Sequence, residues 1–505
     1  MSHTVTIRQN GSVVGVYTAD GGRDIRSFLA GIGVYLDSPC GGRGKCKKCE
    51  VTVADAAVLA CQTVIDRDLD VTLPDNAQMD IAGDETTSKH AVTHNLGVAI
   101  DIGTTTVVAH LHDLDSGERL ASASGVNTQR VHGADVVSRI EYSITHGNGA
   151  LTALIQSQIQ GLIGSACASA NAATTDIRRV VIAGNTIMQH LAAGFDPSGM
   201  GTAPFHPVSL FGGELAPFAG LNLAENAAIF YCPCPASYVG GDITAGYIAC
   251  DLEHDAGPTV FIDIGTNGEI SLKVGDKYYC CATAAGPAFE GAEIDCGMAA
   301  TTGSISHLAW DNGLKITTIG GAEPDGLCGS GLLDALALLL DTGAVDESGR
   351  MLTPSEIGHA IARYIGVRNG KPAFVIDDAR DVYVSSADVR RLQLAKAAIA
   401  GGIATLLRYA DITVAQVRRF VLAGGFGSYM DKNSAARIGL YPREFLAVTQ
   451  SLGNTAGDGA SLVLASAEKR AELEHLITRC EYLELSTSGV FNDEFIENME
   501  FPEGR

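Results

Sequence analysis

The first 75 residues alternate apolar and polar positions in the way that is typical of β-strands. Residues 4–8 and 13–17 lie on either side of Gly11 and predict a hairpin. Residues 24–31 begin with Asp and end with Gly, which predicts a short helix. Further short strands are predicted at residues 50–53 and 71–73. These elements predict a small domain that combines a sheet with one helix.

Two later stretches are apolar almost throughout, and both contain the sequence Asp-Ile-Gly-Thr. The first runs from residue 97 to 111 and the second from 260 to 272, so that Asp263 repeats Asp101 after 162 residues. Each pattern predicts two buried strands joined by a glycine-containing turn. An internal repeat of this kind indicates a duplicated lobe.

Composition limits the classes of function that the chain can have. Its 505 residues are enough for two to four domains. The net charge of −23 argues against nucleic acid or an anionic membrane as a partner. No uncharged apolar run reaches the ~18 residues of a membrane helix, so the apolar residues 332–340 predict an interior helix. An odd number of cysteines, 13, without a signal-peptide pattern predicts the reducing cytoplasm.

A polar stretch separates the two kinds of pattern. Large apolar residues are scarce between residues 74 and 94, and a loop of that length is uncommon inside a compact domain. We therefore predict a linker, and one long surface loop is the alternative. The predicted parts are a domain at residues 1–75, a linker at 76–96, lobe I at 97–256, lobe II at 257–483 and a C-terminal tail at 484–505.

Four cysteines lie within 22 residues of one another: Cys40, Cys46, Cys49 and Cys61. Four thiolates can hold a [2Fe–2S] cluster, and the glycines between them permit the tight loop that a cluster needs. The spacing C-x5-C-x2-C differs by one residue from the plant-type ferredoxin pattern. A structural zinc site is the alternative, although zinc sites tend to have two C-x2-C pairs and this stretch has one.

Each Asp-Ile-Gly-Thr turn carries groups that can bind phosphate. Backbone N–H groups and threonine hydroxyls can bind phosphate oxygens, and aspartates can bind the water around Mg²⁺. We predict that Asp101 and Asp263 organise Mg²⁺. The predicted phosphate-binding residues are Gly103, Thr104, Thr105, Gly265, Thr266 and Asn267. Alternatively, the aspartates only stabilise their own turns.

A third glycine-rich turn follows a predicted strand at residues 419–423. Gly424, Gly425 and Gly427 lack side chains, which lets a nucleotide base and ribose lie flat against the backbone. We predict that these glycines line an adenosine. A plain strand-to-helix turn is the alternative.

The motifs resemble two known folds. The amino-terminal elements and cysteines resemble the β-grasp fold of [2Fe–2S] ferredoxins, in particular the vertebrate-type and corrinoid-activator variants. The phosphate turns, followed by the Gly424 turn, resemble the ATPase of the actin, sugar-kinase and heat-shock-chaperone superfamily. Residues 238–246 and 453–461 resemble the connecting motifs of that superfamily. This resemblance makes Asp242 a candidate for orienting the attacking water, and capping of its helix is the alternative.

A ferredoxin fused to such an ATPase resembles one family, the reductive activators of corrinoid proteins. Other stretches that resemble it are residues 127–129, 133–140, 183–190, 285–292 and 328–334. The implied fold class is α/β and α+β multidomain, with a β-grasp ferredoxin domain followed by a two-lobed actin-like ATPase of duplicated ribonuclease H-like lobes. Two features depart from the family pattern. Only 11 residues separate Cys49 from Cys61, and a short linker stands where larger members carry a domain that helps to pair subunits as a homodimer.

The resemblance implies an ATP-dependent corrinoid protein reductase. Such an enzyme returns one electron to inactive Co(II) in the corrinoid protein of a methyltransferase system and so restores Co(I). The implied cofactors are a [2Fe–2S] cluster, ATP and Mg²⁺, and the implied electron donor is a flavodoxin or ferredoxin. Because a plant-type cluster lies near about −400 mV, we expect ATP to supply the remaining driving force through closure of the lobes.

Three other functions stay open. One is electron donation to a non-corrinoid enzyme, and another is a small-molecule kinase. The cysteine motif speaks against both, because such electron donors place a [4Fe–4S] cluster between subunits and a kinase has no use for a redox cluster. The third is a chaperone that stabilises a corrinoid protein without electron transfer.

Cysteines outside the cluster motif have apolar or small neighbours and predict core packing: Cys232, Cys234, Cys280, Cys281, Cys296 and Cys328. A second metal site is the alternative. His190 and His206 are likewise predicted to pack or cap rather than to catalyse.

Overall fold

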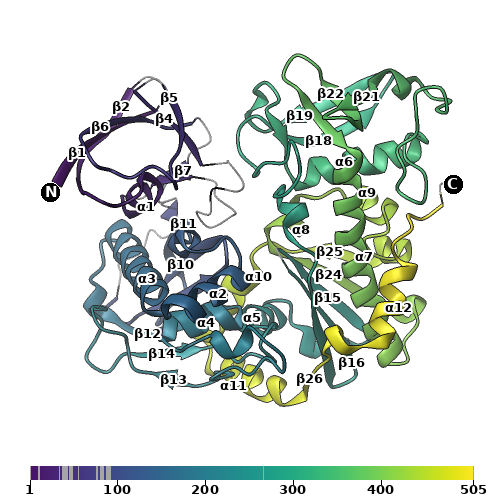
Figure 1. Ribbon diagram of the computed structural model, residues 1–505. Helices are drawn as coiled ribbons and strands as arrows, with labels where there is room; N and C mark the ends of the chain where they lie inside the picture. Colours follow the sequence, from purple (N-terminus) through teal and green to yellow (C-terminus); the bar gives the residue numbers. More distant parts are fainter. Residues whose placement is uncertain are drawn as a thin grey trace. The chain divides into compact units, whose positions relative to one another are not determined.

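A computed structural model describes residues 2–503, apart from 10, 11, 33, 37–43, 45–48, 55, 75–77, 80–84, 87–92 and 266. The described chain forms two compact units (Figure 1). Unit 1 comprises Met1–Ala249 and Ala456–Glu474, and unit 2 comprises Cys250–Thr455 and His475–Arg505. The chain therefore passes between the units at three points. The domain boundaries predicted from the sequence stay predictions.

The first sheet of unit 1 contains the amino-terminal hairpin. Its strand order is β2-β1-β6-β4-β5, with β1 antiparallel to β2 and parallel to β6. Val5, Ile7 and Val71 are buried in its core together with Phe28 of the helix α1. The predicted hairpin, helix and strands are confirmed. The elements are β1 (Ser2–Gln9), β2 (Ser12–Asp20), α1 (Ile25–Gly31), β3 (Val34–Tyr35), β4 (Glu50–Val53), β5 (Ala56–Leu59), β6 (Leu69–Thr72) and β7 (Gln78–Met79).

The second sheet of unit 1 has the order β13-β14-β12-β9-β10-β11-β8. Its strands are β8 (Glu85–Thr86), β9 (Leu96–Ile102), β10 (Thr106–Asp113), β11 (Arg119–Val126), β12 (Ile177–Gly184), β13 (Glu214–Leu215) and β14 (Ala228–Tyr231). The strand β12 runs parallel to both β9 and β14. Because the carboxyl ends of parallel strands meet at one edge, the turn after β9 lies beside the end of β12. The first predicted phosphate turn thus stands at this edge.

Helices pack against the second sheet of unit 1. They are α2 (Val136–His146), α3 (Gly149–Ser169), α4 (Thr186–Ala193), α5 (Gly241–Ala249), α10 (Thr455–Ala465) and α11 (Ala467–Leu476), with a 3-10 turn, η1, at Thr128–Val131. The helices α5 and α10 approach so closely that a Cβ at Gly459 would lie 1.9 Å from the carbonyl oxygen of Ala245. Glycine is required there, because any side chain would overlap the neighbouring backbone.

The main sheet of unit 2 has the order β25-β24-β15-β16-β17-β26. Its strands are β15 (Thr259–Ile264), β16 (Gly268–Val274), β17 (Lys277–Thr283), β24 (Arg419–Ala423), β25 (Thr449–Ser451) and β26 (Cys480–Tyr482). Helices α6 (Gly329–Asp341) and α7 (Ser386–Tyr409) contribute most of their residues to the core. Burial of α6 confirms the predicted interior helix at residues 332–340.

Smaller elements complete unit 2. They are β18 (Ser304–Trp310), β19 (Leu314–Thr318), β20 (Gly326–Leu327), β21 (Ile365–Arg368), β22 (Lys371–Asp377), β23 (Val382–Ser385), α8 (Gly424–Tyr429), α9 (Lys432–Arg437) and α12 (Gly489–Glu497). The segment predicted as a C-terminal tail contains α12, which packs on α7. Arg408 of α7 forms an ion pair of 2.8 Å with Glu494, and the buried Lys396 donates to the carbonyl of Glu500. These contacts hold the end of the chain against the core.

Cysteines outside the cluster motif pack in the two cores. Cys232, Cys234, Cys280, Cys281 and Cys328 are buried, which confirms the predicted core packing for these five, whereas Cys296 is half-buried against the core of unit 2. Burial raises the pKa of these thiols where a shift is resolved, for example to about 12 for Cys234. Within the described ranges, no three His, Cys, Asp or Glu side chains are grouped to hold a metal ion. The described helices include none that is both long and apolar enough to cross a membrane.

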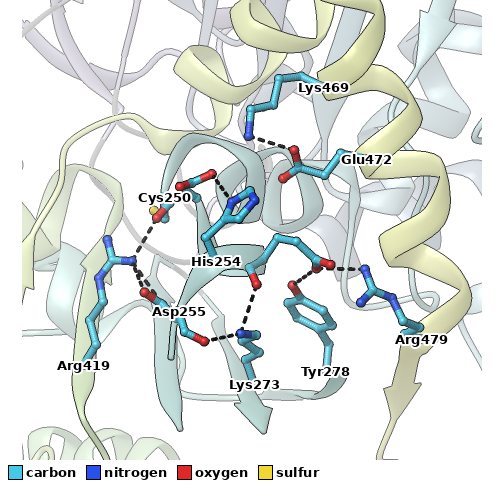
Figure 2. A network of polar contacts seen from close by, with 11 residues as sticks. Cys250, His254, Asp255, Lys273, Tyr278, Arg419, Lys469, Glu472 and Arg479 are labelled. Atoms are coloured by element: carbon cyan, nitrogen blue, oxygen red, sulfur yellow. Dashed lines mark hydrogen bonds and ion pairs between the residues drawn. The ribbon is translucent and has the colours of Figure 1, made fainter. Parts of the chain in front are cut away.

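A polar network fixes the segment by which the chain first enters unit 2, residues 250–255. Figure 2 shows Arg419, at the start of β24, between the carboxylate of Asp255 at 3.0 Å and the carbonyl oxygen of Cys250 at 2.9 Å. Lys273 of β16 donates to the carbonyl oxygen of Asp255 at 2.6 Å. Both cations therefore bind the same entering segment.

Glu253 joins that segment to the one by which the chain enters unit 2 for the last time. Its carboxylate accepts hydrogen bonds of 2.8 Å from Arg479 and from the hydroxyl of Tyr278 (Figure 2). Arg479 follows shortly after His475, where the chain returns from unit 1. The hydrogen bond from Arg479 holds the pKa of Glu253 below its usual value. The network thus ties two of the three chain passages together inside unit 2.

We expect Glu253→Gln to destabilise unit 2 by about 1–2 kcal/mol at pH 7, because the partly buried guanidinium of Arg479 loses its charged partner. The folded-state pKa of Glu253 is depressed, so its contribution is present above the ordinary pKa of 4.5 and is lost as the pH falls below it. Urea unfolding at pH 7 and pH 4 measures both effects.

The control for this experiment is Glu323→Gln. Glu323 pairs with Arg380 in the same unit, but its side chain is 75% exposed. An exposed pair contributes little, so this variant should unfold within about 0.5 kcal/mol of the wild type. Equal stability of Glu253→Gln and the control would contradict the structural role of the network.

Candidate nucleotide and cluster sites

Two of the four predicted cluster cysteines are described, and two are not. Cys40 and Cys46 lie outside the described residues. Cys49 precedes β4 and Cys61 follows β5, and the antiparallel pairing of these strands brings the two segments together. The backbone N–H of Ala60 donates to the carbonyl oxygen of Cys49 at 2.9 Å.

The chemistry around Cys49 and Cys61 fits a thiolate-bound cluster. Neither cysteine is in a disulfide. The side-chain amide of Gln62 lies 3.7 Å from the sulfur of Cys61, which is within hydrogen-bond range for sulfur. Cluster ligation requires thiolates, and amide donors aimed at sulfur stabilise the negative charge that a cluster carries. The assignment of all four ligands stays a prediction.

In unit 1, Asp101 lies near the carboxyl end of β9. It is paired with Val108 on β10 and Ala183 on β12. The turn that follows closes through the N–H of Gly103, which donates to the carbonyl oxygen of Thr106 at 3.0 Å. The structure therefore places the aspartate and the predicted phosphate turn at the edge where parallel strands end.

Three side chains that the sequence did not single out hold this turn. Asn127 donates to the carbonyl oxygen of Gly103 at 2.8 Å, and Arg139 donates to that of Thr104 at 2.6 Å. Asn185, the N-cap of α4, donates to the hydroxyl of Thr104 at 3.1 Å. All three belong to stretches that carry the family resemblance, and that was the only signal for them in the sequence. Their role depends on contacts between distant segments.

Asp242 lies at the same edge, in the first turn of α5. The helix begins at Gly241, so Asp242 is inside the helix and is not its N-cap. Its carboxylate accepts from the N–H of Ile243 at 2.9 Å. The preceding turn is tightly packed, because a Cβ at Gly240 would lie 2.3 Å from the Cα of Asn185. The predicted role of Asp242 in orienting water stays a prediction.

The phosphate turn of unit 2 differs from its counterpart in unit 1. In unit 2, Ile264 pairs with Gly268, whereas in unit 1 Ile102 pairs with Val107, so the second turn is one residue shorter. It closes through the N–H of Gly265, which donates to the carbonyl oxygen of Asn267 at 2.9 Å. Thr266 lies outside the described residues. The repeated sequence thus forms two related but unequal turns.

Asp263 and Gly424 meet at the end of β15. The two strands β15 and β24 are parallel and pair Asp263 with Ala423, so Gly424, the residue that follows β24, reaches the carboxylate. Gly424 has a φ of +77°, and a Cβ there would lie 2.3 Å from Oδ1 of Asp263. Both the backbone conformation and the contact require glycine.

The carboxylate of Asp263 fits a cation site. Among the described residues it forms no ion pair and accepts no side-chain hydrogen bond, and burial raises its pKa to about 6. A carboxylate desolvated in this way gains from a bound divalent cation, and Mg²⁺ prefers carboxylate, phosphate and water oxygens. The residue present therefore suits the metal that an ATPase site requires.

The other two glycines of the turn differ in their surroundings. Gly425 is exposed, and a Cβ there would meet no described atom within 4 Å. Gly427 is buried and lies against Leu422, with a Cβ contact of 3.3 Å, so that packing alone accounts for it. Between them, the ring of Phe426 stacks on that of Phe289, with 5.5 Å between the ring centroids. Contact of these glycines with adenosine stays a prediction.

Comparison with known proteins assigns two parts of the chain to one family. Residues 257–505 match the family described as the C-terminal domain of RACo, the ASKHA domain, and residues 96–255 match the RACo middle region. The chain belongs to the RACo family. Its fold is mixed α/β and multidomain, with an ASKHA domain, the actin-like ATPase fold, in its C-terminal half.

Individual relatives agree with this assignment. The corrinoid activation enzyme RamQ of Eubacterium limosum is 35% identical over 425 residues, which cover 80% of this chain and 70% of RamQ. The Co(II) methylated amine-specific corrinoid protein reductase of Methanosarcina barkeri is 23% identical over 436 residues, covering 79% and 76% of the two chains. A solved structure, the reductive activator for corrinoid,iron-sulfur protein, has a TM-score of 0.71 and 29% identity and covers 99% of this chain and 98% of its own.

The ASKHA assignment of this RACo-family chain implies nucleotide binding. The matched C-terminal domain contains Asp263, the turn after β15 and the Gly424 turn. The matched middle region contains Asp101 and the turn held by Arg139. The residues that contact the nucleotide stay predictions.

We expect Asp263→Asn to stabilise the nucleotide-free protein at pH 7.5 by about 1–2 kcal/mol, a figure reduced for partial exposure. The folded-state pKa of Asp263 is raised to about 6, so the ionised carboxylate destabilises the fold above pH 6 and this penalty disappears as the pH falls. The difference between variant and wild type should therefore shrink toward pH 4. Urea unfolding across pH 4–8 measures it, and a difference that does not change with pH would contradict the burial argument.

Gly424→Ala and Gly425→Ala form a matched pair. Ala at position 424 would have a positive φ and overlap the Asp263 carboxylate, so we expect a loss of about 1–3 kcal/mol of stability and at least tenfold weaker Mg²⁺-ATP binding. Ala at position 425 meets no described atom, so stability should stay within about 0.5 kcal/mol. If adenosine lies against Gly425, this variant should nevertheless bind ATP several-fold more weakly. Unchanged ATP affinity, measured by calorimetry, would exclude Gly425 from the adenosine site.

Proposed function

We propose that this chain is an ATP-dependent reductive activator that returns one electron to the Co(II) of a corrinoid protein and restores Co(I). The observation that carries the proposal is membership of the RACo family across residues 96–505, with relatives named as a corrinoid activation enzyme and as a Co(II) corrinoid protein reductase. The ASKHA domain supports the dependence on ATP.

The electron-carrying part of the proposal rests on the amino-terminal region. Cys40, Cys46, Cys49 and Cys61 would hold a [2Fe–2S] cluster in a β-grasp ferredoxin domain. Bound there, such a cluster supplies one electron at about −400 mV. Support comes from the neighbouring segments of Cys49 and Cys61 and from the amide of Gln62 beside the Cys61 sulfur. A flavodoxin or ferredoxin would reduce this domain.

ATP would supply the driving force that the electron donor lacks. Each 59 mV of one-electron deficit corresponds to about 1.4 kcal/mol. We propose that Asp101 and Asp263 hold the water around Mg²⁺, that the two turns bind phosphates and that Asp242 orients the attacking water. Binding and hydrolysis of ATP would shift the chain between states of different affinity for the corrinoid protein, because a ligand shifts an equilibrium only through its differential affinity.

The partner is proposed to be the corrinoid protein of a methyltransferase system. The net charge of −23 gives the chain no general affinity for nucleic acid or anionic membranes. Pairing of two chains into a homodimer stays a prediction, and so does the cytoplasmic location.

The test is a visible absorption spectrum followed by an activation assay on the same protein. We expect a red-brown protein with two irons and two sulfides per chain that bleaches on reduction with dithionite. It should then convert Co(II) to Co(I) in a candidate corrinoid protein only when ATP is present. Cys49→Ser should lose both the absorption bands and the activation, whereas Cys296→Ser, a partly exposed thiol in unit 2, should retain them.

The same measurements separate the other functions. A colourless, folded protein that contains one zinc and no iron would contradict the electron-transfer function. Activation that persists in Cys49→Ser would indicate a chaperone. ATP-dependent phosphorylation of a small metabolite, with no change at cobalt, would indicate a kinase.

A further inference from the structure

We propose that Arg139 is a positioning residue for phosphate in unit 1: it fixes the Thr104–Thr105 peptide and places a buried positive charge behind the turn. The inference rests on the proposed function, because it takes the phosphates of a nucleotide as the ligand. It assigns a role to a residue that lies 38 positions beyond Asp101 in the sequence.

Three successive carbonyl groups of the turn accept hydrogen bonds from the segment that follows β11 and from α2. Asn127 holds the Gly103 carbonyl through its side chain and the Thr105 carbonyl through its backbone N–H, each at 2.8 Å. Arg139 holds the Thr104 carbonyl at 2.6 Å. These three hydrogen bonds fix the planes of three successive peptides.

Fixed carbonyls imply fixed N–H groups. In a trans peptide the N–H points opposite to the carbonyl, so the N–H groups of Thr104 and Thr105 point away from Asn127 and Arg139. Within the described part of the chain neither N–H donates a hydrogen bond, and Thr105 is exposed. Successive N–H groups held on one side of a turn form an anion-binding nest.

Arg139 itself forms no ion pair among the described residues, and the two charges that act on it, those of Asp135 and Arg130, oppose each other. Its side chain is fully buried, and its other contacts are the Gly133 carbonyl at 3.1 Å, the Gln129 side-chain oxygen at 3.3 Å and the Met188 sulfur at 2.9 Å. All of these groups are uncharged. Burial lowers the pKa of Arg139 to about 9, so it keeps its charge at neutral pH.

A buried cation with only neutral partners is costly, and an anion nearby reduces that cost. The open side of the turn, at the N–H groups of Thr104 and Thr105, is where an anion can approach. The positive charge and the oriented N–H groups therefore act on the same ligand class, the phosphate oxygens of a nucleotide. Adenosine, which has no phosphate, gains nothing from either.

The experiment compares ATP, ADP and adenosine binding in the full-length protein by calorimetry. We expect Arg139→Met to weaken the binding of ATP and ADP at least tenfold, which is about 1.4 kcal/mol, and to change adenosine binding less than twofold. Arg139→Lys keeps the charge but lacks the planar fork, so it should recover part of the loss. Ser143→Ala, which removes only a hydroxyl that donates to the Arg139 carbonyl, is the control and should leave all three affinities unchanged.

The outcomes separate this inference from the proposed function. Wild-type protein that binds neither ATP nor ADP would overturn the proposed function. If the wild type binds ATP, and Arg139→Met loses affinity equally for ATP and adenosine or loses none, only the inference is overturned. If Arg139→Met does not fold, Asn127→Ala is the second variant, because it removes the hydrogen bond to the Gly103 carbonyl without removing a charge. It should weaken the binding of ATP and ADP more than that of adenosine, and an unchanged ratio of ATP to adenosine affinity would overturn the inference.

Discussion

Parallel pairing of β15 with β24 sets Asp263 beside Ala423 and so brings the backbone of Gly424 against the carboxylate. The site in unit 2 depends on this contact. The carboxylate is desolvated without a basic neighbour among the described residues, which raises its pKa to about 6. Burying this negative charge costs less free energy when a divalent cation binds. The site is therefore suited to the metal ion that accompanies ATP.

Unit 1 has the same arrangement of parallel strands, but a buried positive charge contacts its turn. There the parallel strands β9 and β12 bring Asp101 to the sheet edge, but the feature that distinguishes the turn is the buried guanidinium of Arg139. We propose that a metal ion satisfies the buried carboxylate of Asp263 in unit 2 and that phosphate satisfies the buried cation of Arg139 in unit 1. The difference of one residue between the two turns shows that the duplicated motif has diverged in geometry as well as in charge.

Unit 2 also holds the chain at two of the three points where it passes between the units. Glu253, on the segment that enters first, is paired with Arg479, on the segment that enters last. The pair is largely buried and shares the hydroxyl of Tyr278, so moving one segment without the other would leave a charge unpaired. The two segments are therefore tied to each other within unit 2.

The sequence by itself determined the elements and much of the chemistry. Alternation and glycine turns predicted the amino-terminal hairpin, and the duplicated Asp-Ile-Gly-Thr predicted β9–β10 and β15–β16, because period and turn chemistry are local properties. The predicted roles of Cys40, Cys46 and Thr266 rest on the sequence alone. Only the tertiary structure decided which distant residues complete each turn. Asn127, Arg139 and Asn185 come from separate segments, and the family resemblance of those segments did not show that they meet at one turn. The sequence predicted Gly424 as an adenosine contact, and only the structure shows that a Cβ there would overlap Asp263, because the pairing of strands that lie 160 positions apart sets that approach.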